Sequence, residues 1–212
     1  MNRQTAARVA GALFVIADVA GIGGKVLLDR ENDANAVITG AVLVFVMALA
    51  VAMIPVALFP VLKKQNEALA LGYAVLRVIE ALLLTASAVA PLLVLTVGRQ
   101  PATTQPGLQP VAGALSMDEY WAGPFGQIAW SLSVMVLLYL LHRSRAVPRY
   151  ISVWGLAGAP LYLASQLLIL YGVAGPLATI VTAQFGINEL VLVIWLLVRG
   201  LRPAPAATVA VA

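Results

Sequence analysis

The chain has 212 residues, of which 62% are hydrophobic and only 10% are charged. Roughly 25% of the residues of a soluble domain are charged, so the composition excludes an ordinary soluble domain and predicts a membrane-spanning protein. The net charge is +4, but the basic residues gather at the ends of apolar segments, where membrane topology explains them, and we expect no nucleic acid binding. The absence of cysteine excludes disulfides, and a single histidine cannot form a histidine-rich metal site. We expect no metal and no cofactor.

Six apolar segments are long enough to cross a bilayer, which takes about 20 residues. They cover residues 7–28, 34–61, 68–95, 118–141, 149–172 and 177–199. We therefore predict an all-α fold: a polytopic membrane bundle of six transmembrane helices that forms one domain over residues 1–202, followed by a disordered tail over residues 203–212. The first segment resembles a signal peptide, but it carries Asp18 in its middle and continues to Leu28, so we interpret it as a retained span.

The positions of lysine and arginine predict the orientation. With six spans, one side of the membrane receives Arg3, Arg8, Lys63, Lys64, Arg143, Arg145, Arg149, Arg199 and Arg202. The other side receives only Arg30, beside three acidic residues, and Arg99. The positive-inside rule then places both termini in the cytoplasm, for a protein that crosses the plasma (inner) membrane several times, with the lipid bilayer as a partner. The long connection over residues 98–115 would lie outside, and the capping-box pattern at 116–119 predicts that the fourth helix begins there.

Ionisable residues also lie inside the spans. Arg77 and Glu80 are three residues apart, so they share one helical face and can pair. At a rise of about 1.5 Å per residue, Asp18, Glu80 and Glu189 fall near the middle of spans one, three and six. Each such group costs about 3 kcal/mol or more in a bilayer and usually faces the interior of the bundle. Three carboxylates and one arginine are thus predicted to share one depth.

The remaining polar residues of the spans lie on the outer side of this layer. They are Lys25, Thr85, Ser87, Gln127, Ser131, Ser165, Gln166 and Thr182, whereas the cytoplasmic half is nearly all Leu, Val, Ala and Ile. The distribution predicts a polar cavity that is open toward the outside and closed toward the cytoplasm. Desolvation and like-charge repulsion make it costly in free energy for three carboxylates and one arginine all to be ionised there. At least one acid should therefore be protonated at neutral pH.

This pattern suggests a buried site that binds a lipophilic small molecule, with acid-base chemistry on an isoprenoid or another lipid. Glu80 or Asp18 would donate the proton, Glu189 would be a partner acid or stabilise a carbocation, and Arg77 would keep one acid ionised. The candidate substrate-binding residues are Asn188, Trp130, Tyr162, Gln127, Gln166 and Lys25, and aromatic faces among them could stabilise a cation.

Two other functions fit the same residues. They could serve a proton-coupled transporter, although the two halves show no inverted repeat and the apolar cytoplasmic half offers no exit. They could also form a structural polar clasp between helices one, three and six in a non-catalytic membrane partner. The sequence leaves these alternatives, and the oligomeric state, open.

Several short stretches match one family in the same order along the chain. They are 58–67, 70–73, 77–81, 139–141, 144–145, 147–149, 154–156, 189–191 and 195–200. They resemble a bacterial family of small membrane proteins known as domain of unknown function 4386. The resemblance implies a multi-helix membrane protein and includes the pair of Arg77 and Glu80, but it implies no activity. Small integral-membrane terpene cyclases are similar only in their helical architecture and their use of intramembrane acids, and share no motif with this chain.

Overall fold

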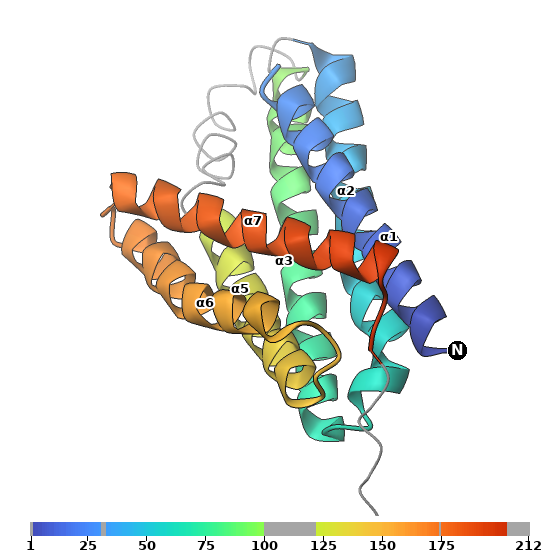
Figure 1. The fold of residues 1–212 in the computed structure, drawn as a ribbon. Helices are drawn as coiled ribbons and strands as arrows, with labels where there is room; N and C mark the ends of the chain where they lie inside the picture. The colour runs from blue at the N-terminus through green and yellow to red at the C-terminus, as the bar shows by residue number, and fades with distance from the viewer. Residues whose placement is uncertain (1, 31–32, 100–121, 174, 203–212) are drawn as a thin grey trace, which may run out of the picture.

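The computed structural model describes residues 2–30, 33–99, 122–173 and 175–202. These residues form helices and no strands. The helices are α1 (Arg3–Leu28), α2 (Ala34–Leu62), α3 (Glu67–Gly98), α5 (Ala122–Arg143), α6 (Arg149–Leu170) and α7 (Pro176–Val198), shown in Figure 1. All 6 are long and apolar enough to cross a membrane. The prediction of an all-α, six-span, multi-pass membrane protein is confirmed.

Three predictions concern residues outside the described ranges. They are the outer connection over 98–115 beyond Arg99, the capping box at 116–119 and the disordered tail at 203–212. The helix bounds elsewhere lie within a few residues of the predicted spans. At 29 and 32 residues, α2 and α3 are the longest helices, and at about 1.5 Å per residue each is longer than a hydrocarbon core of roughly 30 Å. They must tilt or extend beyond it.

Short polar side chains set the beginning of the first three helices. Asn2 accepts a hydrogen bond from the Gln4 amide at the start of α1, and Asn66 accepts one from the Leu69 amide at the start of α3. Asp33 accepts from two amides at the start of α2. Such caps satisfy N–H groups that have no partner within the helix.

The helices form a ring. Each one packs mainly against its neighbours in the sequence, and α7 returns to pack against α1. Figure 1 shows α7 passing from α6 toward the start of α1. There the Gln4 side-chain amide donates to the Leu201 carbonyl at 3.2 Å. Both ends of the described chain therefore lie on one side of the bundle, which we call the terminal side; the opposite side is the distal side.

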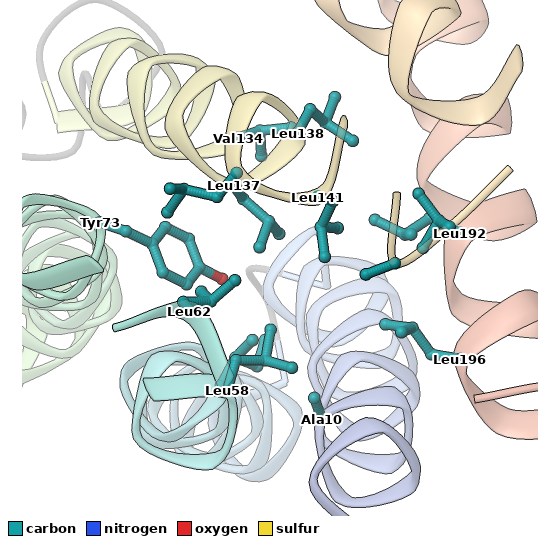
Figure 2. Packing of buried hydrophobic residues seen from close by; sticks show 14 of the residues in the cluster. Ala10, Leu58, Leu62, Tyr73, Val134, Leu137, Leu138, Leu141, Leu192 and Leu196 are labelled. Atoms are coloured by element: carbon teal, nitrogen blue, oxygen red, sulfur yellow. The ribbon is translucent and has the colours of Figure 1, made fainter. Parts of the chain in front are cut away.

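The terminal half of the ring is filled by a hydrophobic core. Buried side chains from all the helices meet there, including Ala10, Leu58, Leu62, Tyr73, Leu137, Leu141, Ile151, Leu192 and Leu196. Figure 2 shows the Tyr73 ring beside Leu62 and Leu137, with Leu192 and Leu196 of α7 facing α1. This core agrees with the apolar composition predicted for that half. It closes the interior of the ring on the terminal side.

Two glycines allow α1 and α2 to approach closely. A Cβ atom on Gly40 would lie 2.8 Å from the Gly24 carbonyl oxygen and 2.9 Å from the Leu28 amide nitrogen. These neighbours are backbone atoms and cannot rotate away. Small residues at such positions are a common means of packing helices in membranes.

We therefore expect Gly40→Ala to destabilise the protein by about 1–3 kcal/mol, the usual cost of overpacking. The melting temperature of the detergent-solubilised protein measures this. Gly72→Ala is the matched control, because nothing lies within 4 Å of a Cβ atom on Gly72. Equal melting temperatures for the two variants would contradict the close approach.

The orientation of the bundle can be tested with single cysteines, because the chain has none of its own. Arg30 and Lys64 are exposed in turns on opposite sides of the bundle. If the terminal side faces the cytoplasm, a membrane-impermeant maleimide should label Arg30→Cys in intact cells and Lys64→Cys only after permeabilisation. The reverse pattern would invert the topology. The cysteine-free parent gives the background.

Candidate functional site

A cavity of about 170 Å³ lies inside the ring, above the hydrophobic core on its distal side. Its lining includes Asp18 of α1, Arg77 and Glu80 of α3, and Glu189 of α7. The structure thus brings together the four ionisable residues that the sequence placed at one depth. Gln127 and Trp130 of α5 add a polar and an aromatic wall, and α2 contributes an apolar wall.

Arg77 and Glu80 form the ion pair that their spacing predicted. Arg77 Nη1 lies 3.0 Å from Glu80 Oε1 and 2.9 Å from Oε2, and donates to both. Arg77 is only 1% exposed and Glu80 only 5%. A charge in such a place is costly unless it is paired, so each residue depends on the other. Both belong to α3, and the pair therefore does not itself connect two helices.

Two aromatic rings flank the Arg77 guanidinium. Its Cζ lies 5.4 Å from the centre of the Phe14 ring and 5.9 Å from that of the Tyr73 ring, within the range of cation–π attraction. Arg77 Nε and Nη2 are fully buried, as is the Tyr73 hydroxyl, and the two side chains interact with each other. Buried donors of this kind usually find an acceptor. The arginine thus holds one carboxylate and lines the cavity beside it.

Asp18 and Glu189 are the less enclosed acids of the site. Both are partly exposed, and they line the same cavity from α1 and α7. Glu189 interacts electrostatically with Arg77, Asp18 and Glu80, and the Trp130 indole lies within hydrogen-bonding range of it. Asp18 interacts electrostatically with Arg77, but forms no ion pair or hydrogen bond with any residue that the structure describes. Neither carboxylate forms an ion pair with a described residue, so both can accept further hydrogen bonds.

Trp130 and Gln127 are held in place from behind. The Trp130 ring packs edge-on against Tyr162 and Phe185, with ring centres 5.1 and 4.8 Å away. The Tyr162 hydroxyl donates to Gln127 Oε1 at 2.8 Å. Tyr162, a candidate binding residue, therefore supports the wall and is not part of the lining. By packing against Trp130 and donating to Gln127, Tyr162 holds these two lining residues in position.

Three other candidate binding residues lie outside the cavity. Asn188 is buried and donates from Nδ2 to the Ile151 carbonyl of α6 at 3.0 Å, on a different face of α7 from Glu189. Gln166 is buried in α6 away from the lining. Lys25 is exposed and lines a groove on the surface between α1 and α7.

The predicted polar layer on the distal side is mostly satisfied locally. The hydroxyls of Thr85, Ser87, Ser131 and Ser165 donate to carbonyls of their own helices, as such residues often do. Thr182 is exposed. Of the eight residues in that layer, only Gln127 lines the cavity. The interior therefore has no polar funnel built from these side chains.

Several lining residues were not predicted. Phe14 lies four residues before Asp18 and so on the same helical face, which is a signal that could have identified it. Met47, Val51 and Ile54 form the apolar wall from α2, but α2 carries no polar residue after Thr39 to indicate which face points inward. Within the described part of the chain, no group of three or more His, Cys, Asp or Glu residues could hold a metal ion.

Comparison with known proteins identifies a family. The family model described as a domain of unknown function, DUF4386, matches residues 9–200, which include part of every described helix and all four charged residues of the cavity. No curated protein and no solved structure matches the chain.

The ion pair makes a prediction about stability. Arg77→Gln and Glu80→Gln should each destabilise the protein by about 3–5 kcal/mol, because each leaves a buried charge without its partner. The double variant should cost clearly less than the sum of the two. Unfolding of the solubilised protein in a denaturant series measures all three. Additive losses would show that the two side chains do not depend on each other.

Proposed function

The chain belongs to the family of domain of unknown function 4386, a family defined by sequence and not by activity, and we therefore propose a function from the site itself. The protein binds the polar group of a lipophilic small molecule among Asp18, Arg77, Glu80 and Glu189, within the membrane. The observation that carries this proposal is the cavity that these four residues share with Trp130 and Gln127. Such residues within a membrane usually have a functional role.

The arrangement supports binding better than a structural clasp. A clasp would connect helices through ion pairs or hydrogen bonds between their charged residues. Among the described residues, the one ion pair lies within α3, and Asp18 of α1 has no direct polar partner. An open space, instead of a direct contact, lies between the acids of α1 and α7 and the pair on α3.

The geometry also supports different chemical roles for the three acids. Both Glu80 oxygens accept from Arg77, so Arg77 is the residue that keeps Glu80 ionised, and Glu80 is poorly placed to give up a proton. Asp18 and Glu189 are the acids available for proton transfer to or from a bound molecule. Acid-base catalysis of the lyase or isomerase type on an isoprenoid or another lipid would use these two carboxylates.

The size of the cavity limits what it can enclose. Pockets for whole drug-sized ligands have volumes of roughly 300–1,000 Å³, and this cavity has about 170 Å³. It fits the polar or reacting end of a lipid and not the entire molecule. A proton-coupled transporter is less well supported, because the hydrophobic core closes the terminal side.

Filling the cavity should remove the ligand. Gly126 lines the cavity, and a Cβ atom there would meet only the Leu83 Cβ, at an ordinary 3.8 Å. Gly126→Leu should therefore keep its melting temperature and lose the lipophilic compound that copurifies with the wild type, as measured by mass spectrometry of extracts.

Gly72→Leu is the control, because it adds the same side chain to α3 in open space. It should retain the compound. If wild type and Gly126→Leu carry the same compounds in the same amounts, the cavity is not the binding site.

A further inference from the structure

A groove on the surface of the bundle continues the cavity outward. It has a volume of about 370 Å³ and runs between α1 and α7. Four residues line both spaces: Ala17, Asp18, Met47 and Glu189. The two available acids therefore lie where the cavity meets the groove.

The contact between α1 and α7 is closed at one end and open at the other. On the terminal side, Leu196 and Leu197 pack against Gly11, and Gln4 bonds to Leu201. Farther along, Gly186 of α7 has no atom within 4 Å of the place where a Cβ would stand. In Figure 1, α7 diverges from α1 toward its own beginning. The two helices form a wedge that opens toward the distal side.

The open part of the wedge faces the surroundings of the bundle. Ile22 and Leu190, on its two edges, are 69% and 52% exposed. Apolar side chains exposed on a membrane-spanning helix face lipid, so a hydrocarbon chain from the bilayer can lie in the groove without leaving an apolar medium. The cavity itself is too small for such a chain.

The charges and donors at the inner end restrict the polar group. An anionic group would meet three carboxylates, Asp18, Glu80 and Glu189. An ammonium group would suit Asp18 and Glu189 but would lie near two cations, the Arg77 guanidinium in the cavity and Lys25 in the groove. A neutral hydroxyl adds no charge beside the acids or beside Arg77 and Lys25, and its O–H can donate to Asp18 or Glu189.

Building on the function proposed above, we propose that the ligand is a neutral long-chain alcohol that enters sideways from the bilayer between α1 and α7. Its hydroxyl lies in the cavity and its chain in the groove. The lipid comes from the distal half of the bilayer, because the wedge opens on that side.

Trp130 can report on binding, because it lines the cavity. The test uses the full-length chain in nanodiscs with Trp121→Phe, Trp154→Phe and Trp195→Phe, which leaves Trp130 as the only one of the 4 tryptophans. The probe is a long-chain primary alcohol with a bromine beside the hydroxyl-bearing carbon, since bromine quenches tryptophan on contact. Brominated carboxylic acid, amine and alkane of the same chain length are the matched probes.

We expect the alcohol to quench Trp130 at concentrations about tenfold lower than the other three probes, because only it combines an O–H donor for Asp18 or Glu189 with the absence of a charge. Equal or stronger quenching by the acid, the amine or the alkane would overturn the assignment of the hydroxyl.

The access route is tested in the same background with Gly186→Phe, which fills the open part of the wedge. Quenching by the alcohol should become at least about tenfold slower, as for a lipid path that a side chain blocks. Gly72→Phe, far from the groove, should leave the rate unchanged. Ile22→Phe fills the same groove from α1 and serves if Gly186→Phe fails to fold.

The outcomes separate this inference from the function proposed above. If Gly126→Leu abolishes quenching while both groove variants bind at the parental rate, the sideways route is wrong and the cavity remains the binding site. If Gly126→Leu binds the alcohol as the parent does, the cavity is not the site and both proposals fail.

Discussion

A charged guanidinium inside an apolar helix must be neutralised nearby, and the site follows from how this chain does so. Arg77 binds both oxygens of Glu80 on its own helix and lies between the rings of Phe14 and Tyr73. The pair is therefore satisfied without the acids of the other helices. Asp18 and Glu189 are left beside a small cavity, and neither forms an ion pair with a residue that the structure describes. The three acids at one depth are thus unequal: one is paired within its helix, and two are available.

Length and rise explain why much of the fold could be predicted from the sequence. A span needs about 20 apolar residues, so the six segments were recognisable by composition alone. The rise of a helix is nearly constant at about 1.5 Å per residue, so the depth of Asp18, Glu80 and Glu189 could be counted from the helix ends. The spacing of Arg77 and Glu80 predicted their contact for the same reason. These quantities depend on the backbone and not on how the helices pack.

Rotation of each helix about its axis was harder to predict, because it depends on packing. Asn188 and Glu189 are adjacent, but the first bonds to α6 and the second lines the cavity. The hydroxyls of Thr85 and Ser131 looked like a polar lining and instead bond to their own helices. The wall from α2 could not be found, since Met47, Val51 and Ile54 lie in a uniformly apolar sequence. The groove could not be predicted either, because it arises from the divergence of two helices that are far apart in the chain.

The contact between α1 and α7 has a consequence for how the protein is made. It is the one junction of the ring that joins the first helix to the last, and the site needs residues from both. Synthesis proceeds from the N-terminus, so Asp18 enters the membrane with α1 long before Glu189 exists. A nascent chain that lacks α7 therefore has an acid and an unfinished cavity exposed to lipid. Completion of the last helix is therefore what closes the ring and completes the cavity.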